Sequence, residues 1–312
     1  MGEERSSKLR RGIDIRKIHY PSGSRYVSVL PMYHVFGLVA DLLATIYTGG
    51  TLCIPDHNLQ LYSCLNYFKP DALHIPPIAA DKLAELLLRS NDVQSVTGGK
   101  LKKIMCAGAP TSIKTMDTLK QYGIQVLCAY GLTECGACVS MNRDHDYKNG
   151  SGGLILDNNT VSISPEGEIL VKGSGVMIGY LNDPESTEFV LRDGWLHTGD
   201  LGYIDEDGFL FINGRLHNMA VFSNGTKFIP EKLEEYLETL PGVAESLACQ
   251  EGNEWRITVC LAHSAFSNAD LCLSLKNRIC SDTLNLTGHM VRSLHLTEES
   301  LPRTATGKLV RM

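Results

Sequence analysis

The sequence predicts an α/β fold in which a lobe with a mostly parallel sheet and a β-rich segment is followed by a small α+β C-terminal domain. Residues 26–140 alternate short apolar runs with segments of helical period. Residues 153–213 alternate apolar and polar positions around tight turns, and the pattern changes again after Arg215. Repetition of strand, helix and strand is typical of a parallel sheet with helices packed on it.

Each element of the first part follows from its local pattern. Short apolar runs predict strands at residues 26–30, 51–54, 72–75, 103–106 and 125–129. Helical periodicity predicts helices at residues 35–47, 59–68, 78–89 and 112–121. Because parallel sheets bind ligands in the loops at the carboxyl ends of their strands, we expect a site in the loops after these strands.

After residue 153 the pattern of apolar and polar residues changes. VSISPEGEILVKG and YIDEDGFLFING alternate around Pro-Glu-Gly and Glu-Asp-Gly turns, which predicts β-hairpins. A proline-led amphipathic helix is expected at residues 230–240, a strand at WRITVCLA and a helix at residues 268–284. We place the boundary at Gly214–His217, which predicts domains at 1–214 and 215–312.

Composition excludes several classes of protein. The 312 residues are 43% hydrophobic and 21% charged, which is ordinary for a globular protein with a substantial core. A net charge of −6 argues against nucleic-acid binding. No apolar run approaches the roughly 20 residues of a transmembrane helix, and the opening lacks the apolar core of a signal peptide. The cysteines lie mostly in apolar stretches, which indicates reduced thiols and a cytoplasmic protein.

Cys135 and Cys138 have the C-x-x-C spacing of some zinc and redox sites. A zinc site of this kind usually needs a second pair or histidines at ligand spacing, and we find neither in the sequence. A redox pair stays open as an alternative. We favour the simpler interpretation of two small residues packed beneath a functional loop.

Separate short segments, in order, carry a resemblance to a known family. They are LPMYHVFG from Leu30, AYGLTE from Ala129, GWLHTGDLGYIDEDGFLFINGR from Gly194 and LPRTATGKLVR from Leu301. Together they resemble the adenylate-forming, or AMP-binding, enzymes, which include acyl-CoA synthetases, aryl-CoA ligases, luciferases and peptide-synthetase adenylation domains. The resemblance implies ligation of a carboxylic acid to CoA through an acyl-adenylate, with ATP/AMP, Mg²⁺ and CoA. VFSNGTKFIPEKLE resembles the acyl-CoA synthetase branch and favours a fatty acid.

The resemblance implies roles for the AYGLTE segment and its neighbours. Tyr130 and Gly131 would contact the nucleotide, with Gly131 allowing close backbone approach. Thr133 would donate to the α-phosphate and Glu134 would bind Mg²⁺. The residues expected beside the acyl group are His34, Ala129 and Leu132. A strand-to-helix turn capped by Thr133 is the structural alternative.

The other segments complete the predicted site. Gly108, Ala109 and Pro110, in CAGAP, match the adenine-binding turn of the family. Asp200 would accept hydrogen bonds from the ribose hydroxyls, and Arg215 would reach ribose or phosphate oxygens with its rigid fork. His197 is expected only to support the loop.

The end of the chain carries the predicted adenylation lysine. Lys308, tethered by glycine, would bridge the carboxylate and the α-phosphate as a compact point charge. His34 would line or gate the acyl pocket. His217 stands at the position of the family hinge, which is usually Asp or Lys, and its charge near neutral pH is variable.

The sequence departs from the family upstream of Leu30. Family members carry there a Ser/Thr/Gly-rich phosphate loop that ends in lysine, whereas YPSGSRY at residues 20–26 has no following lysine. The resemblance therefore implies a partial adenylation lobe, from a fragment, a degenerate product or half of a two-chain enzyme. Self-association or a companion chain would then complete it. The alternatives are a nucleotide- or acyl-adenylate-binding protein without complete catalysis, and a peptide-synthetase-like module, which would need a carrier domain after Arg311.

Overall fold

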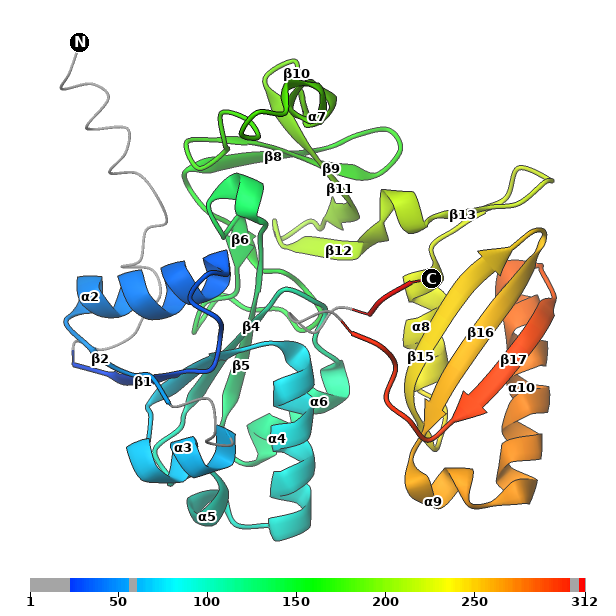
Figure 1. Cartoon of the computed structure of the whole chain (residues 1–312), viewed down its shortest axis with the longest axis horizontal. Helices are drawn as coiled ribbons and strands as arrows, with labels where there is room; N and C mark the ends of the chain where they lie inside the picture. The colour runs from blue at the N-terminus through cyan, green and yellow to red at the C-terminus, as the bar shows by residue number, and fades with distance from the viewer. Residues whose placement is uncertain (1–22, 56–60, 304–308, 312) are drawn as a thin grey trace. The chain divides into compact units, whose positions relative to one another are not determined.

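The computed structural model describes residues 23–55, 61–303 and 309–311 (Figure 1). The chain divides into two compact units. Unit 1 comprises Met1–Thr198 and Tyr203–Ile212, and unit 2 comprises Gly199–Gly202 and Asn213–Met312. Strands β11 and β12 contribute residues to both units.

A seven-stranded sheet in the order β2-β1-β3-β4-β5-β6-β7 organises unit 1. Pairing is parallel from β2 through β5 and antiparallel at β6 and β7. The strands are β1 Arg25–Ser28, β2 Thr51–Cys53, β3 Ala72–Ile75, β4 Lys103–Ala107, β5 Gln125–Tyr130, β6 Ser140–Met141 and β7 Leu154–Ile155. The mostly parallel sheet is therefore confirmed, and the predicted bounds of β3 agree with those observed.

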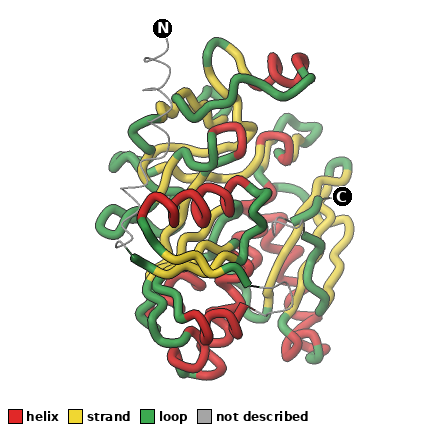
Figure 2. Tube along the Cα trace, turned by 60° about the vertical axis from the view of Figure 1, so that its left-hand side comes forward, coloured by secondary structure: helices red, strands yellow, loops and turns green. Residues whose placement is uncertain are grey.

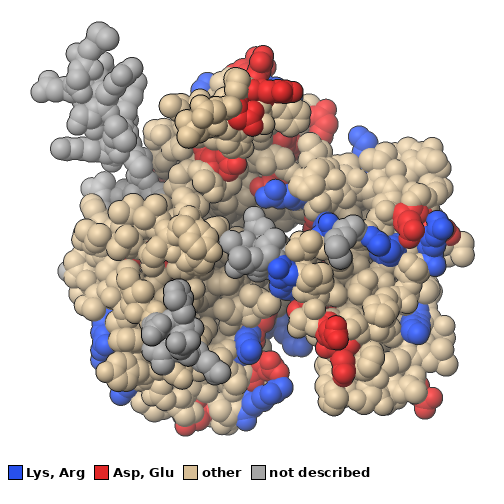
Figure 3. Space-filling view, in the orientation of Figure 1, with Lys and Arg blue, Asp and Glu red and all other residues tan. Residues whose placement is uncertain are grey.

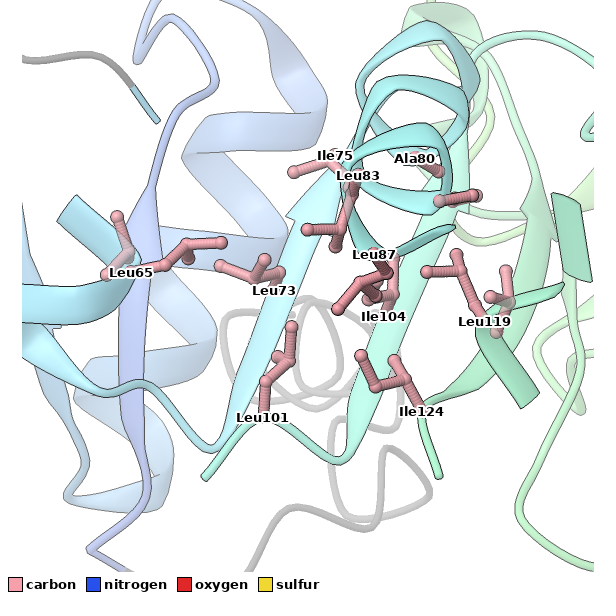
Figure 4. Close-up of a cluster of buried hydrophobic side chains, with 14 of the residues drawn as sticks. Leu65, Leu73, Ile75, Ala80, Leu83, Leu87, Leu101, Ile104, Leu119 and Ile124 are labelled. Atoms are coloured by element: carbon pink, nitrogen blue, oxygen red, sulfur yellow. The ribbon is translucent and has the colours of Figure 1, made fainter. Parts of the chain in front are cut away.

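Helices cover this sheet on one side in a continuous apolar layer. They are α3 Leu61–Phe68, α4 Pro77–Ser90, α5 Val93–Thr97 and α6 Ile113–Gln121. Figures 1 and 2 both show them on the side of the sheet opposite α2. Successive strand residues face opposite ways, so Leu73 and Ile104 meet Leu83, Leu87 and Leu119 from the helices in one buried cluster (Figure 4). Burial of each such leucine stabilises the fold by about 1.5–3 kcal/mol.

On the other side of the sheet, the observed helix differs from the predicted one. The single α-helix predicted at residues 35–47 is instead a π-helix, η2 Gly37–Leu43, followed by α2 Ala44–Thr48. Asp41, in the π-helix, is fully buried and contacts Ser28 and His74 at the ends of β1 and β3. A π turn holds an extra residue and so changes which side chains face the sheet.

A second sheet in the order β10-β11-β9-β8, with β12 paired to β11, follows the first. Its strands are β8 Asn159–Ile163, β9 Glu168–Gly173, β10 Leu191–Arg192, β11 Trp195–Ile204 and β12 Leu210–Arg215, and α7 is Pro184–Val190. β8 and β9 pair antiparallel, so the hairpin predicted at VSISPEGEILVKG is confirmed. The pairing of β12 with β11 confirms the strands predicted around the second turn.

The C-terminal part of unit 2 is α+β, as predicted. Its elements are β13 Ala220–Val221, β14 Lys227–Phe228, α8 Pro230–Glu238, β15 Val243–Glu251, β16 Glu254–Leu261, α9 His263–Phe266, α10 Ala269–Thr287 and β17 Val291–Thr297. Pro230 begins α8, and the side chain of Asn268 caps α10 by accepting from Leu271 N. Fully buried Trp255 packs with Leu233 and Ile279 in the core.

The surface carries charges of both signs. On the face that Figure 3 shows, acidic and basic side chains are interspersed over unit 2. Among the described residues, no helix combines the length and the apolar character that a membrane crossing requires.

Candidate functional site

Two predicted nucleotide-binding segments leave the same edge of the unit 1 sheet. β4 and β5 are parallel neighbours, with Ala107 paired to Ala129. The turn Gly108–Pro110 follows β4, and the loop that contains Glu134 follows β5. Gly108 has a φ of +92°, which only glycine adopts readily. β5 ends at Tyr130, one residue beyond the predicted end.

The loop after β5 is shaped by contacts within the chain. A Cβ on Gly131 would lie 1.9 Å from the carbonyl oxygen of Ala137, so this residue must be glycine whatever it binds. Its approach to a ligand stays a prediction. Thr133–Cys135 form a 3₁₀ turn, η3, whose N-cap is Leu132 with no side-chain cap. The alternative in which Thr133 caps a helix is therefore wrong, and Thr133 is exposed.

Glu134 is held through both its main chain and its side chain. Its carbonyl oxygen accepts a hydrogen bond from Met177 N at 2.7 Å. Its Oε1 accepts one from the Tyr180 hydroxyl at 2.8 Å. Desolvation of the hydroxyl, and secondarily its hydrogen bond to Glu134, raises the pKa of Tyr180 to about 12 although the residue is 37% exposed, so the phenol is a protonated donor at neutral pH. Tyr180 was not among the predicted site residues, because its partner Glu134 lies 46 residues away and nothing in the local sequence pattern joins them.

The residues around Glu134 fit a magnesium ion that is shared with phosphate. Mg²⁺ is usually bound by one or two carboxylates together with substrate phosphates and water. Among the residues that the structure describes, no group of three or more His, Cys, Asp or Glu could hold a metal ion. A single part-buried carboxylate suits a shared cation and does not suit a cage made only of protein.

Asp200 and Arg215, the predicted ribose ligands, lie together in unit 2. Asp200 is buried in β11, and its Oδ1 lies 2.9 Å from Nε of Arg215, the last residue of β12. The Arg215 side chain is 43% exposed, whereas that of Asp200 is 8% exposed. The pairing of β11 with β12 thus joins two residues that are distant in sequence. Contact with ribose stays a prediction.

The residues before Asp200 are fixed to β9. His197 Nδ1 lies 2.9 Å from Glu168 Oε2, and the Thr198 hydroxyl donates to the carbonyl of Ile169 at 2.7 Å. These contacts agree with the supporting role expected of His197.

A buried polar cluster lies beneath the LPMYHVFG segment and was not expected. His74 Nδ1 is 2.6 Å from Asp41 Oδ1, and the Ser28 hydroxyl donates to Asp41 Oδ2 at 2.8 Å. The ring of Phe36 lies 6.0 Å from that of His74. His34 Nδ1 accepts from Phe36 N at 3.2 Å, and its gating role stays a prediction.

The predicted hinge and lysine lie in the C-terminal part of the chain. His217 is exposed in the short 3₁₀ helix η4, Leu216–Asn218, and its role as hinge stays a prediction. Lys308 lies outside the described residues. The residues around it are anchored: Val310 N donates to Pro302 O, and Arg311 donates from two nitrogens to Glu234, each at 2.7 Å.

Cys135 and Cys138 are both buried. Burial raises the pKa of the Cys138 thiol to about 12, which keeps it in the neutral form. A neutral thiol is a poor nucleophile and a poor metal ligand. The structure therefore agrees with the interpretation of two small packing residues.

Comparison with known proteins finds one family model and several CoA ligases that match this chain. Residues 8–181 match the AMP-binding enzyme family. The chain is 31% identical over 312 residues to a long-chain-fatty-acid–CoA ligase of Salmonella typhimurium, covering 94% of this chain and 54% of the relative. It is 28% identical over 294 residues to a 2-succinylbenzoate–CoA ligase of Listeria monocytogenes, covering 92% of this chain and 60% of the relative.

A solved structure agrees with the sequence matches. The O-succinylbenzoate coenzyme A synthetase of Bacillus subtilis, in complex with ATP and a magnesium ion, matches with a TM-score of 0.73 and 26% identity. The match covers 98% of this chain and 63% of that one. The chain spans about half the length of the first of these curated relatives.

Proposed function

Because the chain belongs to the AMP-binding enzyme family, we propose that it serves in the AMP-forming ligation of a carboxylic acid to CoA. A carboxylate oxygen attacks the α-phosphorus of ATP and pyrophosphate leaves. The CoA thiol then attacks the acyl carbon, and AMP leaves as the thioester forms. The shared sheet edge of β4 and β5, with Glu134 and exposed Thr133 beyond β5, is the observation that carries this proposal.

Different residues near the ends of β4 and β5 would contact the adenine, the α-phosphate and the magnesium ion of the nucleotide. The Gly108–Pro110 turn offers a slot for adenine because its small residues leave room for a flat base. Tyr130 lies at the end of β5, where it would border the same nucleotide. Thr133 would donate a hydrogen bond to the α-phosphate, and Glu134 would hold Mg²⁺. The metal ion, when bound, neutralises phosphate charge, and such stabilisation is usually the largest catalytic term.

Asp200, Arg215 and Lys308 would bind the ribose and assist the first step. Asp200 would accept hydrogen bonds from the ribose hydroxyls, with Arg215 as a second anchor. Lys308 would stabilise the charge on the reacting carboxylate and phosphate oxygens during adenylation. A rotation about His217 would then exchange adenylation for thioester formation, as conformational steps do in many enzymes.

The acyl substrate is proposed to be fatty. VFSNGTKFIPEKLE resembles the fatty branch, and one relative is a long-chain-fatty-acid–CoA ligase. His34, Ala129 and Leu132 would line the acyl site. We also propose a cytoplasmic location, from the use of cysteine in the sequence.

A second candidate is a nucleotide- or acyl-adenylate-binding protein without complete catalysis. The specific observation behind it is the segment at residues 20–26, whose serines and glycine are not followed by lysine. Such a protein would retain Glu134, Asp200 and Arg215 and would bind AMP or an acyl-adenylate without turning over ATP.

ATP–pyrophosphate exchange over a panel of carboxylic acids tests the proposal. The assay is run on this chain alone and with an added polypeptide that carries a glycine-rich phosphate loop. We expect exchange that depends on a fatty acid and is lost in Lys308→Ala. Binding of an acyl-adenylate analogue without exchange for any acid, in either mixture, would favour the second candidate.

A further inference from the structure

Tyr180 forms a contact that the reaction itself does not explain. Its hydroxyl donates to Glu134 Oε1 at 2.8 Å across a separation of 46 residues. Three residues earlier in the same segment, Met177 N donates to the carbonyl of Glu134 at 2.7 Å. The segment 177–180 therefore fixes both the backbone and the carboxylate of one residue.

The position of Tyr180 is itself fixed by the start of α7. Tyr180 N donates to the Thr187 hydroxyl oxygen at 2.8 Å, and the Thr187 hydroxyl donates to the carbonyl of Asp183 at 2.7 Å. Asp183 is the N-cap of α7 and accepts from Ser186 N at 3.0 Å. A capped helix thus holds Tyr180, and Tyr180 holds Glu134.

The hydrogen bond leaves the carboxylate able to bind a cation. An ionised carboxylate has about four lone-pair positions, of which the phenol occupies one. A donor on one oxygen fixes the plane of the carboxylate and removes rotamer freedom that a metal ion would otherwise have to restrict. Partners of this kind around a metal ligand typically change metal affinity by about 10–100-fold.

We propose that Tyr180 is a positioning residue that presets the Glu134 carboxylate for a divalent cation bound together with the nucleotide phosphates. The inference rests on the proposed function, because it takes Glu134 as the magnesium ligand. Tyr180 touches neither substrate nor metal in this scheme and acts through Glu134.

The test measures the half-saturating Mg²⁺ concentration for ATP binding by titration calorimetry. Tyr180→Phe removes the hydroxyl and keeps the ring. We expect it to raise the half-saturating Mg²⁺ concentration about tenfold, the lower end of the range for such partners because Tyr180 is 37% exposed. ATP affinity in EDTA and the melting temperature should stay at the wild-type values. Tyr203→Phe, in an exposed tyrosine stacked on Phe211, is the matched control and should change nothing.

Further variants keep the test decisive. Thr187→Val removes the acceptor of Tyr180 N and should shift the Mg²⁺ dependence in the same direction by a smaller factor. If Tyr180→Phe does not fold, the Mg²⁺ dependence of Thr187→Val tests the positioning role in its place. Glu134→Gln should abolish the Mg²⁺ dependence, and adding Tyr180→Phe to it should have no further effect.

The outcomes separate this inference from the proposed function. If Glu134→Gln abolishes the Mg²⁺ dependence and Tyr180→Phe leaves it unchanged, the positioning role is wrong and the metal site stands. If Tyr180→Phe lowers the melting temperature and the ATP affinity in EDTA without a specific Mg²⁺ effect, Tyr180 only stabilises the fold and the positioning role is wrong. If Glu134→Gln leaves the Mg²⁺ dependence intact, or the wild-type chain shows none, both the metal site and the inference are wrong.

Discussion

The two candidate acids are held in opposite ways. In unit 2, buried Asp200 pairs with a cation, Arg215, at 2.9 Å. In unit 1, part-buried Glu134 accepts from a neutral phenol at 2.8 Å. A buried charge needs a charged partner, because its desolvation costs several kcal/mol, whereas a carboxylate near solvent needs only a donor that orients it. From this comparison we expect Arg215 to contribute both to stability and to nucleotide binding, and Tyr180 to contribute mainly to the orientation of Glu134.

The largest expected effect on binding is at Asp200. Asp200→Ala should lose about 2–4 kcal/mol of AMP affinity, the range for truncating one member of a buried hydrogen-bonded charge pair. Titration calorimetry measures it, with Asp193→Ala, in an exposed turn residue, as the control. AMP affinity within twofold of wild type in Asp200→Ala would show that Asp200 does not bind the nucleotide. The contrast between Asp200 and Glu134 as two ligand-binding acids would then be wrong.

A smaller effect is expected on stability at Arg215. Arg215→Met removes the guanidinium beside the buried Asp200 carboxylate and should cost about 1–2 kcal/mol, reduced because Arg215 itself is partly solvated. Tyr180→Phe should cost less than about 0.5 kcal/mol, because water can replace the phenol.

Urea unfolding resolves the two units, since the chain has two tryptophans, Trp195 in unit 1 and Trp255 in unit 2. Trp195→Phe makes the fluorescence report unit 2, the unit of Arg215, and the contribution of Trp195 that this variant loses reports unit 1, the unit of Tyr180. Equal losses of stability for Arg215→Met and Tyr180→Phe would show that the charge of the partner does not matter.

The smallest expected effect is a pH dependence within unit 2. Glu234 pairs with Arg311, whereas Glu238 accepts, among the described residues, from neutral Ser246, with Ser246 N at 3.0 Å. Desolvation of its carboxylate, and secondarily the neighbouring carboxylates, raises the pKa of Glu238 from 4.5 to about 7, and solvent around this exposed residue reduces the effect on stability. Between these values the folded state keeps a proton that the unfolded state releases, so stability should fall as the pH rises from 4.5 to 7.

The check is the urea midpoint of unit 2 across that pH range. Glu238→Gln should flatten the profile, and Glu235→Gln, in an exposed residue of the same helix, should leave it unchanged. An unaltered slope in Glu238→Gln would mean that the carboxylate titrates normally in the folded state.

Local pattern predicted the sheet well and the polar contacts poorly. Apolar runs and proline or glycine turns are local signals, so β3 and the β8–β9 hairpin were predicted from the sequence. The π-helix was not, because it accompanies the contact of Asp41 with His74, 33 residues away. The five-residue helix α5 was missed although Asp92 caps it, since it is too short to show a periodic apolar face.

In the candidate site too, local motifs were recognised from the sequence and tertiary contacts were not. The segments around Glu134 and Asp200 were recognised as short motifs, and the parallel pairing of β4 with β5 brings the Gly108 turn and the Glu134 loop to one edge. Tyr180 was not recognised, because its role comes from a tertiary contact and its own surroundings are ordinary. Gly131 was recognised, but the structure gives it a packing reason that the motif did not indicate.

The central claim is that this chain carries the adenylation lysine of an acid–CoA ligase, and the half-reactions of Lys308→Ala test it most directly. Acyl-adenylate formation from ATP and thioester formation from preformed acyl-adenylate are measured separately, with the added phosphate-loop polypeptide present, and Lys276→Ala, in an exposed lysine of α10, serves as the control. The account predicts loss of adenylate formation with the thioester step spared, because the positive charge is needed only where carboxylate and phosphate oxygens meet. Equal loss in both half-reactions, or none in either, would contradict it.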